Sequence, residues 1–372
     1  MSERKTINRK LLIAWIIAVV AGFTAPMFLE TYWVQLGALV FATAIGAIGL
    51  MLLFGRLGQL SLGHSFFLAL GAYSYVLFAS PADSGSSSGW GLPSPVALIL
   101  AIVVAAVAGL VLSPLAARLK GLSLGLATMA LTFTGVWLLY SLDDLTGGYN
   151  GRNVPALEFG PLSSVGSNIA IGGMQITSQR FVWYAGLIAL LLVVLFTHNI
   201  LGRRIGRALT AVRDADVHAG ALGVNIGEVR AITFVISSAF AGLAGVLIAI
   251  NIQRVVPDYW GLHLSLSYLA MIVIGGMRSI GGATLGALIV TALPSVLQRY
   301  GQSIPGVGSE GGDGLSPAVA AQVLYGAFLV LVLLVQPQGL VRLGKDGYQW
   351  VKDRLFKNDS KQVASTPAET SR

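Results

Sequence analysis

The chain has 372 residues, of which 55% are hydrophobic and only 11% are charged. About 25% of the residues of a typical soluble domain are charged, so this composition excludes an ordinary soluble globular protein. The absence of cysteine excludes disulfide bonds and thiolate metal sites. The net charge of +8 would suit a nucleic-acid-binding protein, but no recognition module accompanies it.

Apolar stretches without charged residues recur along the chain. A helix needs about 20 apolar residues to cross the hydrocarbon core of a bilayer. The first stretch is too long for the apolar part of a signal peptide and lacks a cleavage site, so we expect it to be a retained span. Seven stretches are predicted spans: Leu11–Leu29, Tyr32–Phe54, Val96–Leu115, Gly121–Leu142, Phe181–Thr197, Ala231–Ile250 and Pro317–Val335.

Three further segments are less regular. One predicted span opens at Gln59 with polar residues and glycine, and runs to Ala79. Two others, Leu264–Met277 and Gly281–Leu297, are joined by a glycine-rich turn, and the first of them is short for a full crossing. We therefore expect an all-α polytopic membrane protein with about ten transmembrane segments, within a range of eight to ten.

The basic residues predict the orientation. Four of them precede the first span, and the cytoplasmic flanks of membrane helices are enriched in Lys and Arg. With the N-terminus inside, ten crossings place 20 of the 24 Lys and Arg residues in the cytoplasm. An even number of crossings also places the basic C-terminus there, so both termini are predicted to be cytoplasmic. The four residues predicted to lie outside are Arg152, Arg180, Arg254 and Arg299.

The loops complete the predicted organisation. Residues 1–340 are expected to form the transmembrane domain, and residues 341–372 a basic and polar cytoplasmic tail that is partly disordered. Loops at about 80–95 and 143–180 are predicted outside. The loop at about 198–230 is predicted inside, where it carries several arginines.

The inventory of chemical groups argues against a secondary transporter that relies on carboxylates and against an ATP site on this chain. No Asp or Glu lies within any predicted span, whereas carriers driven by protons or sodium usually place ionisable residues there. The sequence has no GxxxxGK[ST] loop and no HExxH motif. If ATP drives this protein, another chain must bind it, and we expect no cofactor on this chain.

A candidate translocation path lies at the start of the third span. Polar side chains at a helix start loosened by glycine can line a water-filled path, where irregular backbone is tolerated. The alternative is that these side chains only hydrogen-bond neighbouring helices. For the two threonines, which share a helix face, a bond to their own helix is the stronger alternative. The candidates are Gln59, Ser61, His64, Tyr73, Thr128 and Thr132.

The cytoplasmic loop is predicted to hold a short helix that ends near Gly223. It is too charged to span a membrane and too rich in alanine to be disordered. Its small residues would fit a groove on another protein, or its arginines would bind anionic lipid. The candidate contact residues are Arg207, Arg213, Asp214, His218, Ala219 and Gly223.

A glycine-rich turn containing Tyr149 and Asn150 follows the fifth span. It could meet an external partner or substrate. The alternative is a simple helix-ending turn.

Taken together, these segments resemble the permeases of branched-chain amino-acid ABC importers, specifically the LivM-type subunit. The resemblance covers roughly residues 35–340. It rests on five stretches in the expected order: GQLSLGHSFFLALGAY (Gly58–Tyr73), RLKGLSLGLATMALTF (Arg118–Phe133), LTGGYNG (Leu145–Gly151), the segment Gly206–Ala249 and GGMRSIGGATLGA (Gly275–Ala287).

The resemblance implies that residues 1–340 are a permease domain forming half of a translocation path in a prokaryotic inner membrane. Such a permease pairs with a second, LivH-like permease, two ATP-binding cassette subunits and an extracytoplasmic solute-binding protein. It implies that residues 206–225 dock on an ATPase subunit, and that the segment from Gln59 to His64 lines or gates the path. Branched-chain or other hydrophobic amino acids are the implied substrates.

Three alternatives stay open at this stage. The same family includes permeases for urea and short amides, for which Asn150 would be suitable. An autonomous secondary transporter or channel would need no ATPase. An intramembrane enzyme would have to use His64, His218 or His263, which are predicted to lie at different depths in the membrane.

Overall fold

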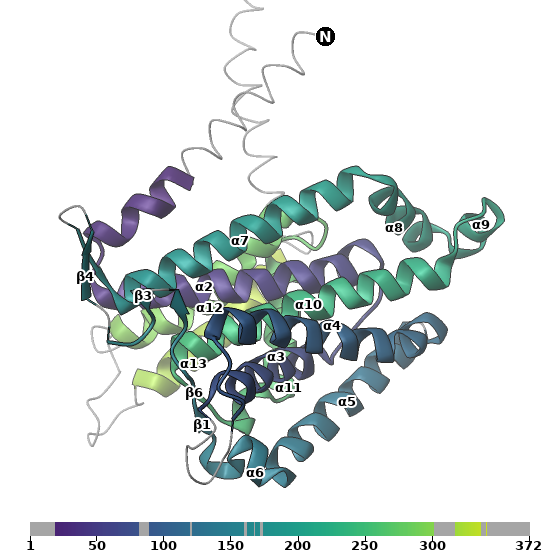
Figure 1. The fold of residues 1–372 in the computed structure, drawn as a ribbon. Coiled ribbons are helices and arrows are strands. Elements are labelled where there is room, and N and C mark those ends of the chain that lie inside the picture. The colour runs from purple at the N-terminus through teal and green to yellow at the C-terminus, as the bar shows by residue number, and fades with distance from the viewer. Residues whose placement is uncertain are drawn as a thin grey trace, which may run out of the picture.

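The computed structural model describes residues 19–81, 89–119, 121–159, 162–166, 168–171, 174–300, 317–335 and 340. The chain is mainly helical (Figure 1). The longer elements, in chain order, are a helix at Val19–Phe28, α2 (Thr31–Leu50), α3 (His64–Ala79), α4 (Ser94–Arg118), α5 (Leu122–Ser141), α7 (Ser178–Gly202), α8 (Arg204–Asp214), α10 (Ile226–Ile252), α11 (Leu262–Gly275), α12 (Ile280–Tyr300) and α13 (Pro317–Val335).

Six helices among the described residues are long and apolar enough to cross a membrane, and three shorter apolar helices accompany them. Each of the ten predicted segments corresponds to a helix. The chain is therefore a multi-pass membrane protein, while the number of crossings and the side on which the termini lie stay predictions. The predicted tail at 341–372 and the first basic residues fall outside the described residues.

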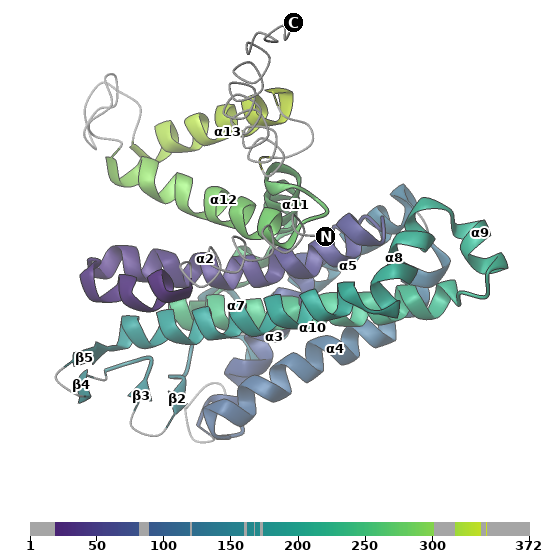
Figure 2. The ribbon, with the colours of Figure 1, turned by 90° about the horizontal axis from the view of Figure 1, so that it is seen from above.

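Helices α2 and α10 form the centre of the bundle. Helix α10 packs against α2, α3 and α4, and α2 also contacts α7 and α12. Figure 2 shows α12 and α13 on one side of this centre and α4 on the other. Small residues allow the close approach of α3 and α10: a Cβ added at Gly71 would lie 2.3 Å from the Gly242 carbonyl oxygen. Such contacts between glycines are a common way to pack membrane helices.

A second close contact between α3 and α10 allows this packing to be tested by substitution. A Cβ at Gly245 of α10 would lie 2.0 Å from the Leu68 carbonyl oxygen, so Gly245→Ala must push α3 away. We expect the clash to lower the free energy of unfolding by about 1–3 kcal/mol, measured as a lower unfolding midpoint in detergent. Gly202→Ala is the matched control, because nothing lies within 4 Å of that position. An unchanged midpoint for Gly245→Ala would contradict the packing described.

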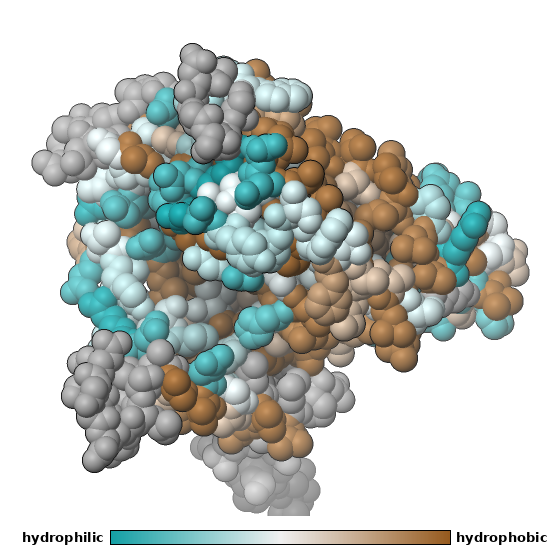
Figure 3. Space-filling view, turned by 90° about the horizontal axis from the view of Figure 1, so that it is seen from below, coloured by the Kyte–Doolittle hydropathy of each residue, from teal (hydrophilic) through white to brown (hydrophobic). Residues whose placement is uncertain are grey.

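Among the described residues, the arginines predicted inside and those predicted outside lie at opposite ends of the bundle. At one end Arg213 and Arg230 bond to elements that also end there, η1 (Met51–Arg56) and α4. At the other end, strands β1 (Arg152–Asn153) and β6 (Arg254–Val255) pair antiparallel. We call these the arginine-rich end and the loop end. Figure 3 shows a broad hydrophobic surface between hydrophilic groups on the left and at the right, where α8 and α9 lie.

The loop end adds short strands to the otherwise helical chain. Short antiparallel strand pairs occur there besides β1 and β6. They are β2 (Glu158–Phe159) with β3 (Leu162–Ser163), and β4 (Asn168–Ile171) with β5 (Met174–Thr177). Short helical turns accompany them: α6 (Asp143–Thr146), η2 (Gly148–Asn150) and η3 (Pro257–Trp260).

Two expectations needed correction. The third span does not open as a helix at Gln59: α3 begins at His64, and residues 59–63 are non-helical after the π-helix η1. The loop helix is broken at Ala215 into α8 and α9 (Asp216–Ala221), because Ala215 has φ −158° and ψ 86°. The predicted end near Gly223 is close, since α9 ends at Ala221 and Gly223 has a positive φ of 82°.

Candidate translocation path and coupling site

The non-helical segment 59–63, which we call the break, joins η1 to α3 inside the bundle. Non-helical backbone at membrane depth needs partners for its polar groups, because no water is available in the hydrocarbon core. Helix α5 supplies two of them. Thr128 Oγ1 accepts a hydrogen bond from the Leu62 amide at 2.9 Å, and Thr132 Oγ1 donates to the Leu62 carbonyl at 3.0 Å.

A third partner comes from α4. The Gln59 side-chain amide donates to the Ala116 carbonyl oxygen at 2.6 Å, and the Gln59 side chain is almost fully buried. Thus a side chain of the break holds the end of α4, while the threonines of α5 hold the break. The two threonines also bond their own helix, as Thr128 does to Leu124, so the packing role predicted for them is present together with the contact to the break.

His64 is the first residue of α3 and is buried. Its Nε2 lies 3.0 Å from the Gly46 carbonyl oxygen of α2. Because a carbonyl only accepts, Nε2 carries the hydrogen in this contact. The imidazole also makes an edge contact with Tyr268 of α11, at 5.0 Å between ring centroids. His64 therefore joins α2, α3 and α11 at the point where the helix begins.

The structure brings five of the six predicted path residues to the break. Tyr73 is separate, since it lies nine residues beyond His64 on α3, or about 14 Å along the helix. Its hydroxyl is buried without a hydrogen-bond partner among the described residues. Ser61 is buried within the break itself.

Sequence reasoning missed two residues of α11. Ser265 Oγ accepts from the Ser65 amide at 3.0 Å and donates to Ser65 Oγ at 2.8 Å, and Tyr268 is fully buried with no partner for its hydroxyl among the described residues. The available signal was a pair of polar residues three apart in a short apolar segment, which places them on one helix face.

At the arginine-rich end, Arg230 of α10 binds two other elements. Its guanidinium donates to the Ala117 carbonyl in the last turn of α4 at 2.9 Å and to the Asp216 carboxylate in the first turn of α9 at 2.6 Å. The Arg230 side chain is only 7% exposed. The carboxylate lies at a helix N-terminus and the guanidinium at a C-terminus, as the two helix dipoles favour. The sequence analysis did not single out Arg230.

Helix α8 is held to the bundle by a second arginine. Arg213 donates a hydrogen bond to the Gly55 carbonyl of η1. The neighbouring Asp214 lies 3.8 Å from Arg278, in the turn between α11 and α12, but both are well exposed, so this pair contributes little. Burial, followed by the charge of Arg278, lowers the pKa of Arg213 from its usual value.

The predicted docking residues differ in their accessibility. Ala219 is buried within the chain, whereas Arg207, His218 and Gly223 are exposed. The most exposed apolar side chains here are Val217 (82%) and Leu222 (84%). Val217 lies on α9 and Leu222 directly after its C-terminal end, on either side of Ala219 in the sequence. These two side chains are accessible to a partner at this end of the chain.

At the loop end, the predicted external turn is folded against its neighbours. Tyr149 is exposed and its ring centroid lies 4.5 Å from that of Tyr140. The Asn150 carbonyl accepts a hydrogen bond from Arg254 at 2.6 Å. The turn is thus fixed to β6 by its backbone, and the Tyr149 side chain is left accessible.

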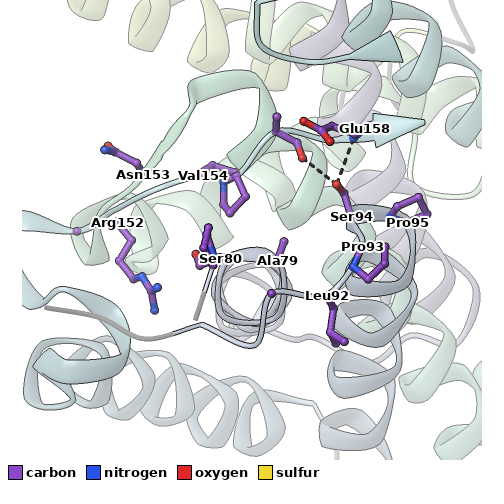
Figure 4. A pocket seen from close by; sticks show the side chains of 15 residues that line it. Ala79, Ser80, Leu92, Pro93, Ser94, Pro95, Arg152, Asn153, Val154 and Glu158 are labelled. Atoms are coloured by element: carbon purple, nitrogen blue, oxygen red, sulfur yellow. Dashed lines mark hydrogen bonds between the residues drawn. The ribbon is translucent and has the colours of Figure 1, made fainter. Parts of the chain in front are cut away.

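A cavity of about 860 Å³ lies beside this turn, between the end of α3, the start of α4 and residues 151–158 (Figure 4). Arg152 and Glu158 lie at its two sides in this view. Ser94 fixes the wall: its hydroxyl donates to the Ala156 carbonyl at 2.9 Å and accepts from the Glu158 amide at 3.3 Å.

The three histidines of the enzyme hypothesis do not form one site. His64 is buried at the break, His218 lies on α9 at the arginine-rich end, and His263 lies on α11 next to η3 at the loop end. In the described part of the chain, no group of three His, Cys, Asp or Glu residues is placed to hold a metal ion.

A bundle of apolar helices with a buried polar break and one arginine-rich end defines a multi-pass membrane protein of the permease type. The family model for the branched-chain amino acid transport system, permease component, matches residues 32–333. The chain belongs to this family.

Individual relatives agree with this result. The chain is 28% identical to the high-affinity branched-chain amino acid transport system permease protein LivM of Escherichia coli K12, over 91% of this chain and 76% of that protein. It is 29% identical to LivH of Salmonella typhimurium, over 80% and 90%, respectively. It is 27% identical to a probable LivM of Methanocaldococcus jannaschii, over 82% and 83%. No solved structure matches the chain.

Proposed function

We propose that this chain is a permease subunit of an ABC importer and forms half of the translocation path for branched-chain or other hydrophobic amino acids. The family match carries the proposal, because it extends from α2 into α13 and so includes the break and the arginine-rich end. The membrane is the inner membrane of a prokaryote, with the arginine-rich end in the cytoplasm.

The partners follow from this role. A second, LivH-like permease completes the path, two ATP-binding cassette subunits bind and hydrolyse ATP, and an extracytoplasmic solute-binding protein delivers the substrate. This chain binds no nucleotide and catalyses no reaction. Its cavity at the loop end, beside the exposed Tyr149, supports contact with the binding protein on that face.

The non-helical break supports the proposal that this chain forms part of a translocation path. Its Leu62 backbone is bonded by the side chains of Thr128 and Thr132 of α5, and its Gln59 side chain bonds a backbone carbonyl of α4. Such non-helical segments occur at substrate sites of membrane transporters. Alternating access then requires the break to exchange partners when the ATPase subunits close.

The proposal is tested by purifying the complex from its native membrane in mild detergent and reconstituting it in liposomes. We expect recovery of a second permease and two ATPases, and ATP-dependent uptake of leucine, isoleucine or valine with the binding protein present. Uptake of urea in place of these amino acids would identify the substrate as urea or a short amide. Uptake by the chain alone, without ATP, would contradict the proposal.

Docking on the ATPase is tested with single cysteines, which the natural chain lacks. We expect Val217→Cys and Leu222→Cys to crosslink efficiently to an ATPase subunit, because both side chains are exposed beside α9. Ala219→Cys is the matched control and should crosslink poorly, since this position is buried within the chain. Crosslinking of the exposed positions only to lipid probes would instead assign this end to the membrane surface.

A further inference from the structure

Arg213 lies across the turn that leads from η1 into the break. Its guanidinium bonds the Gly55 carbonyl, and its side-chain carbons lie against Gly58, where an added Cβ would be 3.2 Å from Arg213 Cγ. Gly58 also has a positive φ of 79°, a conformation that favours glycine. One side chain of α8 thus contacts the Gly55 carbonyl near the end of η1 and Gly58 in the turn, and Gln59 follows directly.

The Gly55 carbonyl is available because of how η1 ends. The amides of Leu57, Gly58 and Gln59 bond the carbonyls of Leu52, Phe54 and Leu53, respectively. None of these three amides bonds the Gly55 carbonyl, which is one of the last carbonyls of the helix and lacks a partner within it. A cation at a helix C-terminus is also favoured by the helix dipole. Arg213 therefore supplies the hydrogen bond that the end of η1 requires.

The residues that follow Gly58 in the sequence belong to the break and make contacts in the candidate path. Gln59 bonds α4, and Leu62 bonds both threonines of α5. A displacement of α8 acts through Arg213 on Gly55 and Gly58, and the next residues along the chain are those of the break. By contrast, Arg230 binds α9 to α4 and α10, and α10 lies at the centre of the bundle.

We propose that Arg213 is a positioning residue that transmits movement of the α8–α9 unit to the break, while Arg230 anchors α9 to the central helices. The proposal rests on the proposed function, because the movement is driven by the ATPase partners. Arg213 and Arg230 thus have different mechanical roles in this proposal. Removal of the Arg213 contact should uncouple ATP hydrolysis from transport without preventing docking.

The experiment uses Arg213→Gln in the reconstituted complex, with Arg118→Gln, an exposed arginine at the end of α4, as the control. We expect uptake to fall about tenfold or more, while ATP hydrolysis stays within about twofold of the unsubstituted complex. Arg213→Lys, which keeps the charge and an ammonium group that can donate to the Gly55 carbonyl, should recover part of the uptake. The control should resemble the unsubstituted complex in both rates.

A second readout follows the break directly. Leu60→Cys, in the partly buried break, and Leu222→Cys, on the docking face, serve as separate labelling sites in the cysteine-free chain. In the unsubstituted background, nucleotide should change the labelling rate at both sites. With Arg213→Gln, the change should persist at position 222 and disappear at position 60.

The outcomes separate the two proposals. Equal loss of hydrolysis and uptake, with loss of the response at position 222, would make Arg213 a docking residue and overturn the inference. Unchanged uptake in Arg213→Gln would overturn it as well. Failure of the proposed function is recognised differently, because the unsubstituted complex would then show no ATP-dependent uptake at all.

Discussion

Replacement of His64 with leucine is expected to lower the ATP-driven uptake rate about tenfold or more, while the complex still assembles. The imidazole donates to the Gly46 carbonyl at the start of α3, and its loss leaves that buried carbonyl without this donor. We expect the loss to be felt in the rate-limiting conformational step of transport, where about 1.4 kcal/mol of lost stabilisation corresponds to a tenfold change in rate. Initial uptake rates in proteoliposomes, normalised to the assembled complex, provide the measurement.

His64→Gln is the informative control, because its amide can donate to a carbonyl as the imidazole does, and it should retain more uptake than His64→Leu. Gln59→Leu removes the bond to the Ala116 carbonyl and should also lower uptake. If both leucine variants transport at the normal rate, the break does not lie on the path, and its polar contacts serve only to hold the helices together.

Replacement of Arg230 with methionine is expected to give the largest loss of stability. The substitution keeps an unbranched side chain but leaves the Asp216 carboxylate and the Ala117 carbonyl without the guanidinium that binds both. Removing one partner of a buried ion pair costs about 3–5 kcal/mol. Because the Asp216 side chain is 24% exposed, we expect about 3 kcal/mol, measured by thermal unfolding of the purified chain in detergent.

Two further variants test the cause. Addition of Asp216→Asn to Arg230→Met removes the carboxylate charge that Arg230 faces in the unsubstituted chain and should restore part of the loss. Arg118→Gln, at the exposed end of the same helix α4, should leave the unfolding midpoint nearly unchanged. A midpoint for Arg230→Met equal to that of Arg118→Gln would show that the pair does not anchor α9.

The helices could be predicted from the sequence because the hydrocarbon core imposes a length and a composition on each span. The break could be predicted only in part. The polar residues and glycines after Gly55 indicated an irregular start, yet the helix begins at His64 rather than at Gln59. That boundary depends on Thr128 and Thr132, which lie more than 60 residues away and hold the Leu62 backbone.

The arginine-rich end could also be predicted only in part, because its local structure depends on residues distant in the sequence. The sequence indicated a single charged cytoplasmic helix. Its interruption at Ala215 depends on Arg230, which holds the first turn of α9. Ala219 was expected at the partner surface because it is small, and it is buried because α9 packs on its own chain. The strand pairs at the loop end were not predicted, since β1 and β6 are two residues long and about 100 residues apart.

The break also has a consequence for energetics across the membrane. It is held by threonine hydroxyls, a glutamine amide and backbone carbonyls, and the charged groups that act on it lie at the arginine-rich end. A unit charge that crosses a potential of about 100 mV gains or loses about 2.3 kcal/mol. Rearrangement of neutral dipoles carries little gating charge, and an amino acid zwitterion adds no net charge. The uptake rate at saturating ATP should therefore be nearly independent of membrane voltage.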